Sequence, residues 1–327
     1  MIFVRIIKNW DWPDLMRQTP DQRGIWDNIQ FTVAPVEECD YVVMLNNNMK
    51  CESIVKCPSE NIWALMQEPY VNGFTDWMVE GHDAFNRVYT NFLPSRTPKY
   101  ITSHPAIPWH VDRSFDELIS CAMPEKKHSL SWVVGNARDL PGHFQRLSFL
   151  KFLQAKAHLD IDLFGRAVRV IDDKWDGLAP YKYSLAVENS CSPDYWTEKL
   201  ADCFLTWTMP FYYGCTNLEE YFPAESFIRI DIGEPAIAIE QIKAAIKNNE
   251  WEKRLPALKR ARELVLNQYQ IFPHLVNQIK ANHNSNAGKI VTRIPPYAKS
   301  INTRINRTFF KIRMAIMQEK DKIRYFN

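Results

Sequence analysis

Polar and charged side chains gather in one short stretch of the sequence, LAVENSCSPDYWTEKL, which begins at Leu185 and ends at Leu200. The first half of this stretch is apolar, as in a buried strand, and the second half is typical of the start of a helix. The polar residues at the join are Glu188, Asn189, Asp194, Tyr195, Glu198 and Lys199. In open parallel sheets, ligands bind beyond the carboxyl ends of the strands, where the next helix begins. The stretch is therefore a candidate ligand site.

Ser192 and Pro193 predict where that helix starts. A capping hydroxyl followed by proline is a favoured start, because the first helical N–H has no partner within the helix. The free N–H groups and the positive end of the helix dipole would favour a phosphate. On this helix Tyr195, Glu198 and Lys199 share one face. A cation for phosphate, with an aromatic ring and a carboxylate for hydroxyls, is typical of a nucleotide-sugar site.

The spacing by itself favours a plainer interpretation. Glu198 and Lys199 are then solvated charges of an ordinary helix, and Ser192 is an ordinary cap, since capped helices with charged first turns are common. Spacing alone leaves both interpretations open.

Short apolar runs alternate with helix-compatible stretches along most of the chain. The runs are MIFVRII, YVVMLN, NIWALMQEP and RVYTNF, and then, after the polar segment CAMPEKKHS, SWVVGN, IDLFGR, YSLAVEN, PFYYG and FIRID. Strands that alternate with helices predict a parallel sheet covered by helices. We therefore predict an α/β fold of two Rossmann-like lobes with a cleft between them, at residues 1–122 and 123–280, followed by a C-terminal helical tail at 281–327.

Composition indicates a folded protein: 46% of the 327 residues are hydrophobic and 13% are aromatic, enough for two cores. No stretch near the N-terminus has the pattern of a membrane span or of a secretory signal, so a cytoplasmic location is expected. The seven cysteines are scattered, with no CxxC pair and no zinc-like cluster with histidine, which indicates reduced thiols.

Residues 181–232 closely resemble the donor-binding core of glycosyltransferase family 10, the α-1,3/1,4-fucosyltransferases. The stretch contains, in order, the words ENS, DYWTEK, TMPFYYG and NLEEYFPAESFIRIDI, where the family has ENS, DYxTEK, a proline-containing strand that ends in glycine, and NYEEFxPxxSFIxVDDF. A thinner resemblance covers residues 60–275.

This resemblance implies the two-lobed fold called GT-B, with an acceptor lobe first and a GDP-fucose lobe second. It implies an inverting fucosyltransferase that moves L-fucose from GDP-β-L-fucose to a hydroxyl of a glycan, with an α-1,3-type linkage. It implies no metal and no cofactor beyond the GDP-fucose donor. The expected partners are GDP-fucose and an oligosaccharide or glycolipid acceptor, as in protein glycosylation or lipopolysaccharide biosynthesis, and no nucleic acid.

The resemblance also implies donor-binding residues, which are Arg146, Glu188, Asn189, Tyr195, Glu198 and Lys199. Lys199 stands where the family's lysine contacts phosphate, and Glu198 where its glutamate contacts the ribose or the sugar. Arg146, in HFQRLSFLKFL, resembles an arginine at the start of the first donor-lobe helix that faces the diphosphate. A solvated helix arginine is the alternative interpretation of Arg146.

The catalytic base implied by the family is a glutamate in a word like ESP after an early strand. This chain has Gln67-Glu68-Pro69 there, and alignment on the proline puts Gln67 at the position of the base. Some bacterial relatives carry glutamate directly before the proline, so we predict Glu68. It would take a proton from the acceptor hydroxyl in a single displacement, while Lys199 and Arg146 stabilise the departing GDP. A loop carboxylate without catalytic duty is the alternative.

Several other residues have a weaker claim to chemistry. Asp160 and Asp162 form a DxD-like pair, but they begin an apolar strand, and strand alternation explains them. His104 and His143 are expected to be ordinary loop residues. Trp109 and His110 are expected to border the acceptor.

The C-terminal region is strongly basic, with ten Lys or Arg and two Asp or Glu over residues 289–327. Apolar residues recur at helical spacing (Ile301, Ile305, Phe309, Ile312 and Ile316), and basic residues lie mostly off that stripe (Arg304, Arg307, Lys311 and Arg313). A basic amphipathic helix predicts peripheral contact with the inner face of a membrane, through residues 301–324. Packing of this helix across the two lobes is the alternative.

Two other functions stay open at this point. A transferase of the same fold could use another GDP-linked sugar, because the matched words carry the nucleotide contacts and leave the sugar contacts less defined. A glycan- or nucleotide-binding relative without turnover is the other, because the position of the base is ambiguous between Gln67 and Glu68.

Overall fold

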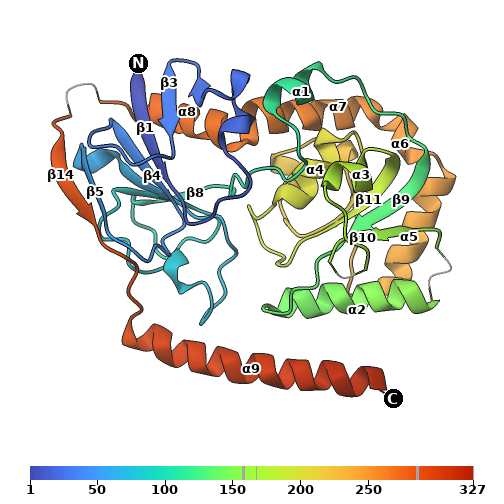
Figure 1. Ribbon diagram of the computed structural model, residues 1–327. Coiled ribbons are helices and arrows are strands. Elements are labelled where there is room, and N and C mark those ends of the chain that lie inside the picture. The colour runs from blue at the N-terminus through green and yellow to red at the C-terminus, as the bar shows by residue number, and fades with distance from the viewer. Residues whose placement is uncertain (157–158, 167, 285–286, 327) are drawn as a thin grey trace. The chain divides into compact units, whose positions relative to one another are not determined.

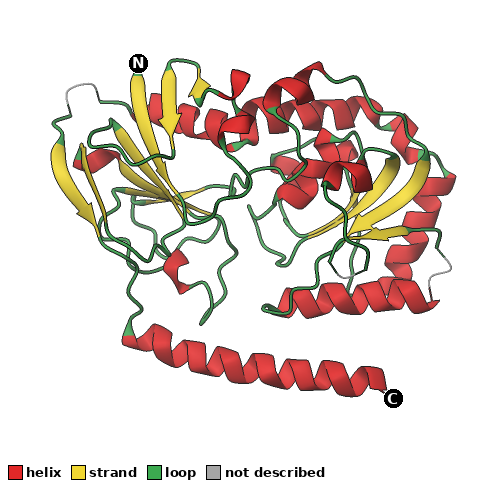
Figure 2. Cartoon of the chain, in the orientation of Figure 1, coloured by secondary structure: helices red, strands yellow, loops and turns green. Residues whose placement is uncertain are grey.

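The structure, a computed structural model, describes residues 1–156, 159–166, 168–284 and 287–326 (Figure 1). These residues form two compact units. The first unit comprises Met1–Pro108, Ser114–Asp116 and Ile271–Ala315, and the second comprises Trp109–Arg113, Glu117–Gln270 and the described residues from Ile316 onward. Each unit combines a sheet with helices, which Figure 2 distinguishes by colour.

The first unit contains a seven-stranded sheet with the order β2-β3-β1-β4-β6-β7-β8. Neighbouring strands run parallel, except β2 and β3, which are antiparallel. Every residue of the central β4 and β6 is buried, as expected of parallel strands covered on both faces. The strands are β1 (Ile2–Ile7), β2 (Ile25–Trp26), β3 (Ile29–Thr32), β4 (Tyr41–Leu45), β6 (Ile62–Leu65), β7 (Arg87–Thr90) and β8 (Tyr100–Thr102).

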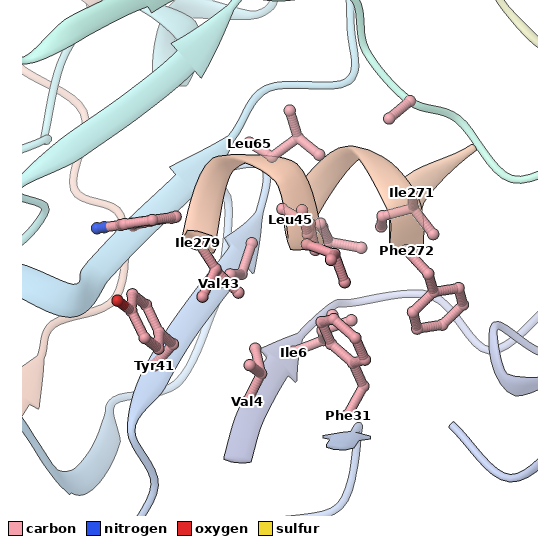
Figure 3. Close-up of a cluster of buried hydrophobic side chains, with 14 of the residues drawn as sticks. Val4, Ile6, Phe31, Tyr41, Val43, Leu45, Leu65, Ile271, Phe272 and Ile279 are labelled. Carbon is pink, nitrogen blue, oxygen red and sulfur yellow. The ribbon is translucent and has the colours of Figure 1, made fainter. Parts of the chain in front are cut away.

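Helix α8 (Ile271–Asn282) packs on this sheet, although it follows most of the second unit in the sequence. Its residues Ile271, Phe272 and Ile279 join the strand residues in one buried cluster (Figure 3). The rings of Phe31 and Phe272 meet edge to face, with centroids 5.0 Å apart. Strand β14 (Ile290–Ile294) also belongs to the first unit, where it pairs antiparallel with β5 (Ser53–Cys57).

The second unit contains a parallel five-stranded sheet with the order β10-β9-β11-β12-β13. Its strands are β9 (His128–Val133), β10 (Asp162–Phe164), β11 (Tyr181–Val187), β12 (Met209–Tyr213) and β13 (Ile228–Arg229). Its longer helices are α2 (Pro141–Lys156), α4 (Glu198–Leu205), α5 (Pro235–Lys247) and α7 (Leu255–Leu264). The predicted α/β class, with a largely parallel sheet in each of two units, is confirmed.

Shorter elements connect these helices and strands. They are α1 (Phe115–Ser120), α3 (Lys174–Leu178), α6 (Glu250–Lys253), the 3₁₀ turns Met16–Gln18, Pro20–Gln22, Ser59–Asn61, Asp76–Met78, Leu218–Glu220 and Ala224–Ser226, and a π-helical turn at Val265–Tyr269.

The basic C-terminal region forms the helix α9 (Ile301–Phe326). Its first turns pack on the first unit through Thr303, which donates a hydrogen bond of 2.7 Å to Glu80 Oε1, and through Phe310, whose ring centroid lies 5.3 Å from that of Phe74. The apolar stripe identified in the sequence lies on another face, where Ile301, Ile305, Phe309, Ile312 and Ile316 are all more than half exposed. No helix among the described residues is long and apolar enough to cross a membrane.

Candidate functional site

The polar stretch lies where it was expected, between the end of β11 and the start of α4, but the predicted start of the helix is wrong. Helix α4 begins at Glu198, and Thr197 is its N-cap. Asp194 has a positive φ of 59°, and its N–H donates to Asn217 Oδ1 at 2.8 Å. The left-handed residue interrupts helical geometry directly after Pro193, so Ser192 is not the cap.

This correction removes Tyr195 from the helix that carries Glu198 and Lys199. Tyr195 lies in the preceding loop and is buried, and its hydroxyl donates to Asn189 Oδ1 at 3.0 Å. The three side chains therefore do not share a helix face. The contact of Tyr195 with Asn189 instead joins the two ends of the loop.

Glu188 is the first residue after β11 and is buried. Its carboxylate accepts hydrogen bonds from Thr197 N at 2.8 Å and from Thr197 Oγ1 at 2.8 and 2.9 Å, and Lys199 Nζ lies 3.3 Å away. Burial raises the pKa of Glu188, and the charge of Lys199 opposes that rise. Glu188 thus holds the cap and the lysine of α4 in place.

Glu198 is surrounded by nitrogen atoms on its Oε1 side. Lys199 Nζ lies 3.2 Å from Oε1, Lys174 Nζ 3.7 Å and His110 Nδ1 3.9 Å. Burial opposes ionisation, but the charges of Lys199 and Lys174 outweigh it and hold the pKa of Glu198 well below its usual range. The carboxylate is therefore ionised at neutral pH.

Lys199 is the cation at the centre of the site. Its ammonium group donates to Thr197 Oγ1 at 3.1 Å and lies close to the carboxylates of Glu188 and Glu198. Burial alone would lower the pKa of Lys199, but the two carboxylates raise it above its usual value. About a quarter of its side chain is exposed, so a charged ligand can reach an amine that stays protonated.

Arg146 is a second cation of the site, contributed by α2. It is 6% exposed, and its Nε atom has no hydrogen-bond partner among the described residues. Burial lowers its pKa, while the nearby charges of Glu188 and Glu198 raise it. Its burial argues against the interpretation of Arg146 as a solvated helix residue. A buried guanidinium nitrogen without a partner is costly, and an anionic ligand would satisfy it.

The start of α2 is locked against the loop after β11. A Cβ atom added to Gly142 would lie 2.0 Å from the carbonyl oxygen of Asn189, so only glycine fits there. The Nδ1 atom of His143 accepts from the N–H groups of Asp139 and Leu140 at 3.1 and 3.2 Å. His143 is therefore not an ordinary loop residue, because it caps the helix that carries Arg146.

Two residues near Glu198, Asp202 and Lys174, were missed in the sequence. Asp202 is buried, and its carboxylate accepts from Lys174 Nζ at 3.0 Å and from His110 N at 2.8 Å. The position of Asp202, four residues after Glu198 on one helix face, is the only sequence signal for this group. Nothing in the pattern around Lys174 points to it. Trp109, expected beside an acceptor, is 1% exposed.

The residues proposed for the catalytic base lie in the first unit, directly beyond β6. Gln67 is buried, and its side-chain amide donates to the carbonyl oxygens of Pro105 and Ala106 at 3.3 and 3.4 Å. Glu68 is only partly buried, and its carbonyl oxygen accepts from Asn91 Nδ2 at 3.0 Å. Of the seven predicted site residues, the six for the donor come together in the second unit, and Glu68 lies in the first.

No group of three or more potential metal ligands lies close together within the described part of the chain. Asp162, from the DxD-like pair, accepts a hydrogen bond of 2.8 Å from the hydroxyl of Tyr181. Its position is therefore explained by a contact between β10 and β11, the two strands that flank β9.

Comparison with solved structures finds an α1,3-fucosyltransferase with GDP-fucose, with a TM-score of 0.47 and 15% identity over 83% of this chain and 92% of that one. A pneumococcal O-GlcNAc transferase in complex with UDP and GlcNAc has a TM-score of 0.41 and 13% identity over 74% of this chain and 52% of that one.

Comparison of sequences is more specific. A 4-galactosyl-N-acetylglucosaminide 3-alpha-L-fucosyltransferase of Pongo pygmaeus is 34% identical over 111 residues, 32% of this chain and 30% of that protein. The 4-galactosyl-N-acetylglucosaminide 3-alpha-L-fucosyltransferase 9 of Mus musculus is 33% identical over 134 residues, 39% of this chain and 36% of that protein. The match thus spans about a third of the length of these relatives. Residues 123–251 match the family model for the C-terminal domain of glycosyltransferase family 10 (fucosyltransferase). Over these residues, the chain is similar to glycosyltransferase family 10.

Proposed function

We propose that the protein is an inverting fucosyltransferase that transfers L-fucose from GDP-β-L-fucose to a hydroxyl of a glycan acceptor, with an α-1,3-type linkage. The proposed division by function is an acceptor lobe at residues 1–122, a donor lobe at 123–280 and a tail at 281–327. It differs from the compact units, in which Ile271–Ala315 belongs to the first unit. The names of the relatives, which are 3-alpha-L-fucosyltransferases, support the reaction. The observation that carries the donor site is the buried Arg146 Nε atom without a partner, in the same cluster as Lys199.

In this proposal the diphosphate of the donor binds Arg146 and Lys199. The guanidinium supplies a hydrogen-bond donor that has no partner among the described residues, and the ammonium supplies a charge held by Glu188. As GDP departs, negative charge grows on the diphosphate, so cations already fixed there stabilise the transition state more than the ground state. These two residues supply the charge that a metal ion supplies in other transferases, so no metal is required.

Glu198 is proposed to bind hydroxyl groups of the ribose or the sugar through its ionised carboxylate. Tyr195 and Asn189 are proposed to border the donor from the loop after β11, where they are hydrogen-bonded to each other.

Glu68 is proposed as the general base, which removes a proton from the acceptor hydroxyl as that oxygen attacks the anomeric carbon. The alternative position, Gln67, has no ionisable group, and its amide is already bonded to backbone carbonyl groups. The contrast supports Glu68 over Gln67.

Calorimetric titration in EDTA with GDP, GDP-fucose, GDP-mannose and UDP-galactose tests the donor site. Binding of the GDP compounds without metal, with GDP-fucose preferred over GDP-mannose, is the expected result. Preference for GDP-mannose would favour a transferase of another GDP-sugar. Binding without release of GDP in the presence of varied glycan acceptors would favour a non-catalytic relative, and no binding of GDP compounds would overturn the proposal.

A further part of the proposal concerns α9, which we place on the inner face of a membrane as a peripheral contact through residues 301–324. The apolar stripe is exposed, while Thr303 and Met314 are buried on another face. The described side chains end at residue 319, so the rest of the predicted segment lies outside them. Flanking arginine and lysine side chains complement an anionic lipid surface.

Sedimentation with vesicles that contain phosphatidylglycerol, compared with phosphatidylcholine alone, tests this contact. The double replacement Ile305→Ser and Phe309→Ser removes two exposed apolar side chains and is expected to reduce binding to the anionic vesicles. Ile237→Ser is the control, because this residue is 58% exposed on α5, away from the stripe. Equal sedimentation of both variants with the unmodified protein would end the membrane proposal.

A further inference from the structure

Lys174 lies within the charged cluster of the second unit, although it belongs to neither the matched words nor the predicted site. It is the first residue of α3, and its ammonium group lies 3.0 Å from Asp202 Oδ2 and 3.7 Å from Glu198 Oε1. Asp202 is almost fully buried, and about a quarter of the Lys174 side chain is exposed. Burial would lower the pKa of Lys174, but Asp202 and Glu198 raise it, so the amine is charged at neutral pH.

The position of α3 is itself well determined. Asp173 caps this helix by accepting from Trp175 N at 2.8 Å, and its carboxylate also accepts from Asp112 N and Arg113 Nη1, each at 2.9 Å. Lys174 therefore approaches Glu198 and Asp202 from an anchored turn of backbone. A charge held in this way keeps a constant distance from its partners.

Two lysines, Lys199 and Lys174, together neutralise the carboxylate of Glu198. Lys199 lies 3.2 Å from Glu198 Oε1, and it also serves Glu188 at 3.3 Å. Burial lowers the pKa of His110, so this third neighbour is a weak source of positive charge at neutral pH. If Lys174 were absent, Lys199 would be the one full cation within 4 Å of Glu198 in the described chain, and Asp202 would lose its lysine.

We propose that Lys174 is a positioning residue that neutralises Glu198 and Asp202 from α3 and thereby leaves the ammonium group of Lys199 available to the diphosphate of the donor. Lys174 acts through Lys199 and Glu198 and does not itself contact the ligand. The inference rests on the proposed nucleotide-diphosphate donor. Its direct consequence is selectivity, since loss of the Lys174 charge weakens binding of phosphate groups more than binding of the nucleoside.

A purely structural role makes a different prediction. If Lys174 only ties α3 to α4, its loss loosens the whole site, and affinity for a nucleoside falls together with affinity for its diphosphate. The ratio of the dissociation constants for guanosine and GDP separates the two roles, because both ligands share the base and the ribose.

Lys174→Met removes the charge, and Lys174→Gln removes it while keeping a hydrogen-bond donor for Asp202. Both variants are expected to weaken GDP about tenfold while guanosine changes by less than about twofold, as the loss of one partly buried charge interaction predicts. Lys174→Arg keeps the charge and is expected to restore most of the GDP affinity. Calorimetry with guanosine, GMP and GDP measures the ratios, and circular dichroism melting identifies any variant that is unfolded.

Lys126→Met is a matched control in the same unit. Lys126 is also largely enclosed, but its ammonium donates to the neutral oxygens Ala179 O, Thr206 O and Thr208 Oγ1, at 2.8, 2.7 and 3.2 Å. This variant loses three hydrogen bonds and no partner of Glu198, so its ratio of guanosine to GDP affinity is expected to stay that of the unmodified protein.

A double-mutant cycle with Glu198→Gln adds a second test. If Lys174 acts through Glu198, then Lys174→Met is expected to weaken GDP several-fold less in the Glu198→Gln background than alone. Equal loss of guanosine and GDP in both Lys174 variants, or full additivity in the cycle, would overturn the inference. Failure of the unmodified protein to bind GDP would instead count against the proposed function, so the two failures are distinguishable.

Discussion

In each unit, a pair of polar residues follows a central strand. Both pairs consist of one buried residue and one partly exposed residue. After β6 come Gln67, which is buried, and Glu68, which is partly exposed, and after β11 come Glu188, which is buried, and Asn189, which is partly exposed. In both pairs the buried side chain is bonded to neighbouring protein groups. The buried member thus fixes the strand end, and the partly exposed member is presented beyond it.

The two pairs differ in the charge of the buried residue and of its partners. Gln67 is a neutral amide held by the backbone carbonyl groups of Pro105 and Ala106, whereas Glu188 is a carboxylate next to Lys199. A buried carboxylate is stable only with cations or several donors around it. In the second unit, lysine side chains therefore lie next to the buried carboxylates. The same lysines make this unit suited to an anionic ligand. The comparison teaches that similar strand ends can serve different chemistry.

The strongest test of the comparison is to neutralise the residue presented by β6. Glu68→Gln is expected to lower the rate of fucose transfer by about 100-fold or more, because general base catalysis contributes that much. GDP-fucose affinity is expected to change by less than about twofold, since the six residues proposed to bind the donor lie in the other unit. A coupled assay of GDP release and calorimetry measure the two quantities.

Glu60→Gln is the control for this change, since Glu60 precedes β6 whereas Glu68 follows it. Transfer by Glu68→Gln at the rate of the control would remove Glu68 from the mechanism.

A second test removes a cation from the other unit. Arg146→Met is expected to weaken GDP-fucose binding by about 10- to 100-fold, because it deletes a charge-assisted donor to the diphosphate. Calorimetry measures the affinity. Gln145→Met, at an exposed neighbouring position on α2, is expected to bind normally. Unchanged affinity in Arg146→Met would show that the buried guanidinium serves the fold alone.

A third test concerns how α2 is held against the loop after β11. Gly142→Ala places a methyl group against the carbonyl oxygen of Asn189, so we expect a loss of up to about 3 kcal/mol in the free energy of unfolding. Gly135→Ala is the matched control, because its added atom would meet Arg146 Nη2 at an ordinary 3.8 Å. Denaturant titration measures both. Equal stability of the two variants would mean that α2 can shift away from the loop.

The smallest expected effect is a pH dependence. Burial lowers the pKa of His143 to about 4. Between about pH 6.5 and 4, His143 is therefore protonated in the unfolded chain and neutral in the folded state. Stability is therefore lost as pH falls through this range, by about 2 kcal/mol between pH 7 and 4.5. For His143→Gln, the loss of unfolding free energy between pH 7 and 4.5 is expected to be smaller by about this amount. Denaturant titrations at the two pH values measure it.

His274 in the first unit has its pKa lowered to about 4 by burial as well. His274→Gln is therefore expected to give a similar reduction. If the stability of both variants and of the unmodified protein depended on pH in the same way, neither histidine would have a lowered pKa in the folded state.

Much of the fold and part of the site could be predicted from the sequence. The strand series predicted two parallel sheets, because apolar runs of strand length, separated by helix-compatible stretches, have few other ways to be buried. The polar join after Tyr181–Val187 was located for the same reason. The resemblance then pointed to Arg146, which no local pattern indicated, because a lone arginine on a helix is usually solvated.

Local reasoning failed where distant residues decided the outcome. Ser192 and Pro193 have the composition of a helix start, but Asn217 binds the backbone of Asp194 and moves the start to Glu198. Trp109 was expected beside a ligand, yet it is part of the buried core. In the first case, a contact across the fold outweighs a weak local preference.

By itself, the sequence determined most of the central strands and which of their ends carry polar groups, because burial leaves a regular pattern of apolar residues along the chain. The strands β2, β3, β5, β8 and β14 were not predicted. Only the tertiary structure decided that α8 and β14 belong to the first unit, that the apolar stripe of α9 is exposed, and that Lys174 lies next to Glu198. These facts depend on contacts between segments far apart in the chain. Such contacts leave no periodic signal in the sequence, because the local residue pattern of a segment does not depend on which distant segment it contacts.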